Sequence, residues 1–426
     1  MTVESTPRPW TALLDGALRD RALGAAVAVA TALSTTDFTE NPAATELTLN
    51  GCLGTVIFLT ALAESVDSRY ADAARMLFDD AAGRIDSIDD LTCGLYSVPI
   101  GIGLVDSMVR SRLGEDSETA DDEDIDTFTA NLLAVDPWTG PVDLIHGIAG
   151  LGVYCLARMP RPSAHASLTR IVTHLRTTAE ETLEGLTWRY VSTLGEAAAF
   201  TERRPDGTVN CGFAHGVPGI VTFLAAAHKA HVPDAGDLLL SAVEWLTAHR
   251  LAPGEPTSFP AFVIPGRPPE SSRLAWCYGD PGVAVALLAA GDALGESYLI
   301  DLARTVARGC ATQSPAGVAD ATLCHGTTGL GHIFNRLAQA LGDEVLLDMA
   351  RTWFQRTLDR HLRHLTVVDR SSAKRLRDHG AVLAVEPGPG LLFGASGAGL
   401  ALLAAATDAA PWWDAALLVD VPTTGG

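Results

Sequence analysis

The stretch CHGTTGLGHIF, residues 324–334, places two glycines three positions apart at the start of an apolar run. Six other segments repeat this pattern, near residues 50, 97, 146, 215, 278 and 393. The second glycine is present in all seven copies: Gly54, Gly101, Gly150, Gly219, Gly282, Gly329 and Gly397. The first glycine is missing in one copy, where Val98 takes its place. A pattern that recurs this often along one chain indicates a repeat architecture.

Each glycine pair is expected to mark a tight turn that opens an apolar helix, because glycine permits sharp turns and close backbone approach. Successive copies are 47 to 69 residues apart, which is enough for two helices and their connections. Between the copies, apolar residues recur at steps of three and four, most clearly at 70–85, 167–186, 237–251 and 345–362. Each copy is therefore predicted to be a helix pair that buries its apolar faces by stacking on its neighbours. Seven stacked pairs form an open solenoid or a closed ring, and the pattern alone favours neither.

The composition excludes some classes of protein. The chain has 426 residues, 47% hydrophobic and 19% charged, so it is not mainly disordered. Its formal net charge of −21 argues against nucleic-acid binding, since phosphate neutralisation needs a basic face. Part of the acid excess lies in the run EDSETADDEDID, residues 115–126. We predict a solvated loop between helices there, with contact to a basic partner as the alternative.

The N-terminus lacks the pattern of a secretory signal, and no window approaches about 18 consecutive apolar residues. The cysteines number seven, which is odd for a disulfide framework. We therefore expect a cytoplasmic protein without a transmembrane segment, folded as one domain over residues 1–426. Five of the cysteines are expected to act as small apolar core residues: Cys52, Cys93, Cys155, Cys211 and Cys310.

Two longer spacings predict insertions, near residues 186–212 and 360–390. The first contains TWRYVST, residues 187–193, which is a candidate short strand. The second carries a basic patch at residues 360–377 on an otherwise acidic protein. This patch is predicted to be a solvated loop, with a dock for an acidic peptide or partner as the alternative.

Aligning the seven copies brings polar residues into register. The position before the first glycine holds Asn50, Ser97, His146, His215, Tyr278, His325 and Phe393. One position earlier, Cys277 and Cys324 occupy the same column in consecutive copies. Equivalent positions of a repeat line one face, and loops on a rigid scaffold are where function usually lies. These two columns therefore mark the candidate site.

The shared column predicts that the thiols of Cys277 and Cys324 approach each other, and His325 follows Cys324 directly. Two thiolates and one imidazole, with no evident fourth protein ligand, describe an open tetrahedral zinc site. Buried cysteines are often ordinary core residues, but their register in two neighbouring copies favours the metal site.

Other polar residues accompany this set. His215 is predicted to have a chemical role, and Asp143, the only ionisable residue of its column, is placed to orient an imidazole or tune its pKa. Arg273, four residues before Cys277, supplies either a fixed positive charge near the metal or a surface salt bridge. Tyr278 adds a hydroxyl beside Cys277. His146 either lines the cavity or caps its turn.

Four segments resemble the LanC family of lanthionine synthetases, the cyclases of lanthipeptide biosynthesis: WCYGDPG at 276–282, CHGTTGL at 324–330, AHGVPG at 214–219, and the segment 143–147. WCYG together with CHG is highly specific for this family, and the resemblance extends from about residue 50 to about residue 399. It implies an all-α double α/α toroid of seven helix pairs, and hence a closed ring. It also implies one Zn²⁺ per chain on Cys277, Cys324 and His325. The family's acid/base histidine falls on His215, and its accompanying polar residues on Asp143, Arg273 and Tyr278. Val98 departs from the pattern and leaves the geometry of its own turn open.

The resemblance implies an intramolecular Michael addition, in which a cysteine thiol of a precursor peptide attacks dehydroalanine or dehydrobutyrine and forms a (methyl)lanthionine ring. Zinc coordination deprotonates a thiol, and a formally neutral site leaves the sulfur nucleophilic. His215, oriented by Asp143, is the candidate proton donor to the α carbon, and Arg273 or Tyr278 the candidate stabiliser of the oxyanion. The implied partners are a dehydrated precursor peptide and, further, a lanthipeptide dehydratase.

Two other functions fit parts of the pattern. One is a LanC-like zinc protein that binds glutathione or adds it to dehydrated peptides without closing rings. The other is an α/α toroid of different chemistry, such as a glycoside hydrolase or a terpene cyclase. A hydrolase needs paired carboxylates, and only Asp143 and Asp280 lie near the predicted turns.

Overall fold

The computed structural model describes residues 9–34, 46–85, 93–114, 121–190, 205–360 and 389–421. This part of the chain is mainly helical, with two short two-stranded sheets. Its contacts divide it into two compact units. The first comprises Met1–Asp90, Gly101–Ser117 and Ala316–Gly426, and the second comprises Leu91–Ile100 and Glu118–Pro315. One domain over residues 1–426 stays a prediction.

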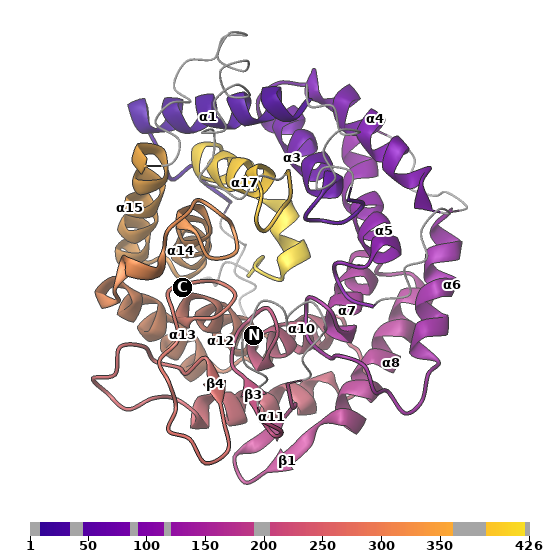
Figure 1. Ribbon diagram of the computed structural model, residues 1–426, viewed down its shortest axis with the longest axis vertical. Coiled ribbons are helices and arrows are strands. Elements are labelled where there is room, and N and C mark those ends of the chain that lie inside the picture. Colours follow the sequence, from indigo (N-terminus) through magenta and orange to yellow (C-terminus); the bar gives the residue numbers. More distant parts are fainter. Residues whose placement is uncertain are drawn as a thin grey trace, which may run out of the picture. The chain divides into compact units, whose positions relative to one another are not determined.

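In the first unit, α3 pairs with α4 and α14 with α15, as the repeat predicts. Helix α17, which opens the seventh copy, packs against α1, a helix that precedes the first copy in the sequence (Figure 1). Trp10 Nε1 donates to the Ala404 carbonyl at 2.9 Å and ties the N-terminal segment to α17. The elements of this unit are α1 (Gly16–Ser34), α3 (Cys52–Ser65), α4 (Tyr70–Ala82), most of α5 (Val98–Val109), η2 (Arg110–Leu113), α14 (Thr327–Leu341), α15 (Glu344–Arg360), α17 (Ala395–Ala406) and η5 (Trp412–Leu417).

In the second unit, α7 pairs with α8, α10 with α11, and α12 with α13, while α10 contacts both α7 and α12. β1 pairs antiparallel with β2, and β3 with β4. The elements are α6 (Asp121–Leu133), α7 (Ile148–Ala157), α8 (Pro162–Thr178), β1 (Glu180–Thr182), β2 (Gly185–Thr187), β3 (Val209–Asn210), α10 (Val217–Lys229), α11 (Ala235–Ala248), β4 (Phe262–Val263), α12 (Asp280–Leu294), α13 (Ser297–Gly309), η3 (Cys310–Thr312) and η4 (Pro315–Gly317).

The seven helices predicted from the glycine pairs are confirmed: α3, α5, α7, α10, α12, α14 and α17. In six of them the first glycine is the N-cap residue. In the copy that lacks this glycine, Val98 is itself the first residue of α5. The second glycine allows a close approach: a Cβ on Gly282 would collide with the Trp276 carbonyl, and one on Gly329 with that of Leu323. Each turn therefore folds back onto the first turn of its own helix.

One predicted helix is too long. The segments 70–85 and 237–251 largely coincide with α4 and α11, and residues 345–360, the described part of the last segment, lie in α15. In segment 167–186, by contrast, the helix α8 ends at Thr178. Glu180–Thr182 and Gly185–Thr187 then form a hairpin instead. Gly185 has a φ of +134°, which favours glycine and is not helical. The strand predicted within 187–193 is present in part, because β2 ends at Thr187 and Arg189 bridges Val209.

The acidic run is only partly a loop. Residues 121–126 form the first turns of α6, contrary to the loop predicted for 115–126, and Asp126 accepts a hydrogen bond from the Tyr154 hydroxyl at 2.6 Å. Residues 115–120, 191–204 and 361–388 lie outside the described part of the chain, and with them nearly all of the basic patch and of the second insertion. None of the helices described is long and apolar enough to cross a membrane.

Candidate functional site

Asp143 and His215 lie together in the second unit, in the loops that precede α7 and α10. Asp143 Oδ1 accepts hydrogen bonds from the backbone N–H groups of Ile145 and His146, both at 2.8 Å. The same oxygen is 3.4 Å from His215 Nδ1. Because two backbone donors fix the carboxylate, its position does not depend on the histidine. Asp143 is therefore placed to orient the imidazole of His215.

The His215 ring lies among other rings. His146 stacks beside it with a centroid separation of 5.4 Å and an interplanar angle of 23°. Tyr278 is the next ring, at 6.3 Å and 30°. His146 is predicted either to line the cavity or to cap its turn. Its stacking on the ring of His215 favours the first of these roles. A pocket borders this group, and its walls include Pro141, Asp143, Trp188, Tyr190, His215 and Ile220. Trp188 and Tyr190 belong to the first insertion, so the insertion contributes to the site.

Arg273 lies beside Cys277 in the loop that precedes α12. Its Nη2 atom donates to Cys277 Sγ at 3.0 Å, and its guanidinium carbon is 5.9 Å from the centre of the Tyr278 ring. Of the two roles considered for Arg273, this contact favours the fixed positive charge. A guanidinium at hydrogen-bond distance stabilises the thiolate form of a cysteine.

The loop that precedes α14, in the first unit, carries Cys324 and His325. Asp320 Oδ2 is 3.4 Å from His325 Nε2, and Asp320 Oδ1 accepts from the backbone N–H and the hydroxyl of Thr322 at 2.8 and 2.7 Å. Burial on its own would raise the pKa of Asp320, but hydrogen bonds from His325 and Thr322 outweigh it and hold the pKa at about 2. Asp320 is thus a carboxylate that faces one ring nitrogen of His325.

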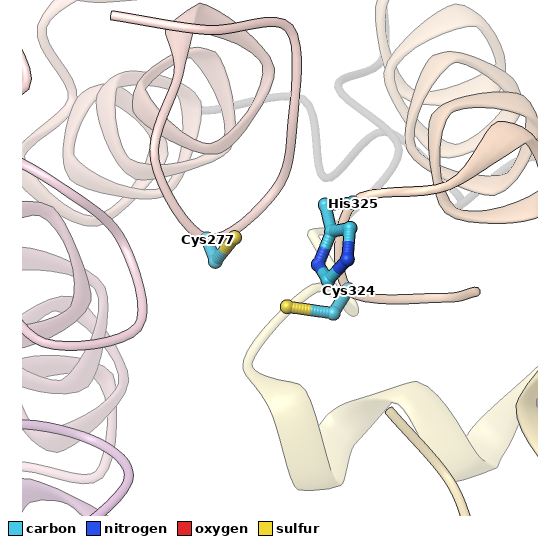
Figure 2. Close-up of side chains that lie close together, drawn as sticks. All are labelled: Cys277, Cys324 and His325. Carbon is cyan, nitrogen blue, oxygen red and sulfur yellow. The ribbon is translucent and has the colours of Figure 1, made fainter. Parts of the chain in front are cut away.

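Cys277, Cys324 and His325 lie close together (Figure 2). The two sulfur atoms and one ring nitrogen are within 4.8 Å of one another. Both cysteines are buried and His325 is half-buried. Sulfur ligands 2.3 Å from a tetrahedral zinc ion are about 3.8 Å apart, so this donor set has the composition and approximate spacing to hold a metal ion.

Four of the five remaining cysteines, Cys52, Cys155, Cys211 and Cys310, are buried core residues as predicted. Burial raises the pKa of Cys52 to about 11 and the pKa values of Cys155 and Cys211 to about 12, and it raises the pKa of Cys310 as well. A thiol with a raised pKa is a poor nucleophile and a poor metal ligand at neutral pH. Cys93 is half-buried and donates to the His146 carbonyl at 3.3 Å.

Asp280, the second carboxylate that a hydrolase would need, is fully buried at the start of α12. It accepts hydrogen bonds from the backbone N–H groups of Ser258 and Phe259 at 2.7 and 3.0 Å and from Gln313 Nε2 at 2.6 Å. Burial raises its pKa. These bonds tie three chain segments together, which is a structural role.

Sequence reasoning missed Asn210 and Asp320. Asn210 Nδ2 donates to the Tyr278 hydroxyl at 3.1 Å, and Asp320 faces His325. Both lie five positions before the histidine of their own copy, and Arg273 lies five positions before Tyr278. That column therefore holds three residues that contact predicted site residues. Including this column in the alignment of the seven copies would have marked Asn210 and Asp320 as candidate site residues.

Comparison with known proteins shows the family and the fold of this chain. The family model described as lanthionine synthetase C-like protein matches residues 45–418. The nisin biosynthesis protein NisC of Lactococcus lactis subsp. lactis is 25% identical over 297 residues, which cover 61% of this chain and 66% of that protein, just under two thirds of its length. The solved structure of nisin cyclase matches with a TM-score of 0.68 and 20% identity, over 89% of this chain and 94% of that one. This match confirms the predicted fold class, the all-α double α/α toroid. With the family model matching most of its length, the chain belongs to the lanthionine synthetase C-like family.

Proposed function

We propose that this protein is a zinc-dependent lanthipeptide cyclase. It would join cysteine thiols of a dehydrated precursor peptide to dehydroalanine or dehydrobutyrine by intramolecular Michael addition. The observation that carries the proposal is the clustering of Cys277, Cys324 and His325 within 4.8 Å. Membership of the lanthionine synthetase C-like family supports it.

The donor set suits zinc. Two thiolates and one neutral imidazole are common zinc ligands, and three protein ligands leave a fourth position for a substrate atom. Bound zinc would supply the Lewis acid that deprotonates the substrate thiol at neutral pH. Asp320 would keep the proton on His325 Nε2, so that Nδ1 is the nitrogen assigned to the metal.

The other residues have separate tasks. Arg273, at 3.0 Å from Cys277 Sγ, would hold that sulfur as a thiolate. His215 would deliver the proton that the α carbon takes up after the sulfur has added to the β carbon. Asp143 would hold the ring of His215 in one tautomer and orientation. Tyr278 would donate a hydrogen bond to the carbonyl oxygen on which charge develops.

The substrate must reach the enzyme already dehydrated, because none of these groups removes water from serine or threonine. A dehydratase that acts on the same precursor peptide is therefore the further partner we infer.

The test is a comparison of two cysteine variants. The substrate is a peptide with one dehydroalanine and one cysteine, and glutathione is left out. Ring closure leaves the peptide mass unchanged but removes the thiol that N-ethylmaleimide alkylates. Cys324→Ala is expected to lose both bound zinc and ring closure, whereas Cys310→Ala, which removes another buried thiol, keeps both. A zinc-free protein that still closes rings contradicts the proposal. Peptide that gains the mass of glutathione, only when glutathione is added, supports the non-cyclising alternative.

A further inference from the structure

Asn210 connects two loops of the second unit. It is the last residue of β3 and is 1% exposed. Its Oδ1 atom accepts a hydrogen bond from the Gly212 backbone N–H at 2.8 Å, and its Nδ2 atom lies 3.1 Å from the hydroxyl oxygen of Tyr278.

These two contacts fix the direction of the second hydrogen bond. A backbone N–H only donates, so the atom that faces Gly212 must be the amide oxygen of Asn210. The amide nitrogen then faces Tyr278, and an amide NH₂ group also only donates. The Tyr278 oxygen therefore accepts in this bond, and its own hydrogen points away from Asn210.

The ring of Tyr278 has little room to move. A Cβ on Gly212 would lie 2.6 Å from Tyr278 Cδ1, so the backbone of the Asn210 loop rests on the ring. Phe262 packs at a centroid distance of 5.6 Å and His215 at 6.3 Å. The ring of Tyr278 is thus held in place beside the ring of the proposed proton donor, and its hydroxyl oxygen is held by Asn210.

We propose that Asn210 is a positioning residue that makes Tyr278 a hydrogen-bond donor to the carbonyl oxygen of the dehydrated residue. This inference rests on the proposed function. In the addition, the substrate sulfur bonds to the β carbon, the double-bond electrons move towards the carbonyl oxygen, and the α carbon then takes up a proton. A donor aimed at that oxygen stabilises the transition state more than the ground state, because the negative charge develops only during the reaction.

Three single variants and one double variant separate this role from simple support of the fold. Asn210→Asp keeps the shape and, at a pH at which the new carboxyl is ionised, offers only acceptors, so Tyr278 turns its hydrogen towards residue 210. Asn210→Ala removes the side chain and leaves the tyrosine able to donate elsewhere.

We expect kcat to fall roughly 10²-fold in Asn210→Asp and in Tyr278→Phe, and clearly less in Asn210→Ala. The double variant Asn210→Asp/Tyr278→Phe should lose no more than either single change. If Asn210 only supports the fold, Asn210→Ala is at least as impaired as Asn210→Asp, and this order overturns the proposal.

A spectroscopic readout keeps the test independent of turnover. The intensity ratio of the tyrosine Fermi doublet in the Raman spectrum reports whether a tyrosine hydroxyl mainly accepts or donates. The difference between wild type and Tyr278→Phe isolates the doublet of Tyr278. It should shift towards the donor pattern in Asn210→Asp, with zinc content unchanged. An unshifted doublet overturns the assigned polarity. A shifted doublet, together with a wild-type protein that closes no rings, shows that the proposed function has failed instead.

Discussion

Asp143 holds His215 through an oxygen atom that two backbone N–H groups already fix, at 3.4 Å from His215 Nδ1. The turn that begins α7 thus builds the acceptor, and the turn that begins α10 presents the ring to it. A carboxylate on one ring nitrogen favours the tautomer that carries its proton there, and it stabilises the charged imidazolium. In the proposed reaction the other nitrogen, Nε2, would then be the one that exchanges a proton with the substrate.

Replacing Asp143 by asparagine tests this relationship. The amide oxygen still accepts from Ile145 and His146, but the negative charge beside His215 is lost. We expect kcat for ring closure to fall roughly 10²-fold, in the range typical of an impaired acid/base group, with little change in KM or zinc content. Asp301→Asn, an exposed change in α13, is the control and should match wild type. Wild-type kcat in Asp143→Asn would show that the carboxylate is dispensable.

Asp320→Asn is expected to weaken zinc binding about 10- to 100-fold, because a metal-bound histidine depends on the acceptor of its second ring nitrogen. The dissociation constant can be measured by competition with a chromophoric chelator, without peptide substrate. Asp348→Asn removes an exposed carboxylate of α15 that pairs with Arg351, and it should leave the constant unchanged. Equal affinities in the two variants would remove Asp320 from the metal site.

The glycine pattern makes a prediction about stability. Gly329→Ala places a methyl group against the carbonyl of Leu323, and we expect it to lower the free energy of unfolding by at least about 2 kcal/mol. Gly309, at the end of α13, has a helical φ of −58° and no atom within 4 Å of the added Cβ. Gly309→Ala should be neutral or stabilising by up to about 1 kcal/mol. Urea unfolding of both variants checks the contrast, and equal stability would refute the close-approach argument.

The repeat allowed much of this protein to be predicted. Seven glycine pairs located seven helix starts, and the two columns beside them selected Cys277, Cys324, His325 and His215. The packing of α1 against α17 was not predictable, because α1 carries no copy of the motif and its partner is fixed only by the folded chain. The column five positions before the histidine or tyrosine marks Asn210 and Asp320 as candidates, but the atoms that they contact, the Tyr278 hydroxyl and His325 Nε2, could be identified only in the folded chain.

A last prediction concerns pH and the buried group formed by His332, Arg336 and Asp414. His332 Nε2 is 2.7 Å from Asp414 Oδ2, and Arg336 Nη2 donates to Asp414 Oδ1 at 2.7 Å. Burial lowers the pKa of His332 below its usual value, although Asp414 acts in the opposite direction. Burial would raise the pKa of Asp414, but Arg336 and His332 lower it overall.

The sign of the effect follows from these directions. Below about pH 6.5 the unfolded chain protonates His332 before the folded protein does, so the free energy of unfolding falls as the pH drops. Below about pH 4, stability that depends on ionised Asp414 is lost as well. His332→Gln should flatten the fall of the unfolding free energy between pH 7 and pH 5 by up to about 1.4 kcal/mol per pH unit, the value for one proton.

His165→Gln, on the partly exposed side of α8, is the control and should keep the wild-type slope. Urea unfolding at pH 7, 6 and 5 measures the slopes. A slope in His332→Gln as steep as that of wild type would mean that His332 takes up its proton equally in both states, which its complete burial opposes.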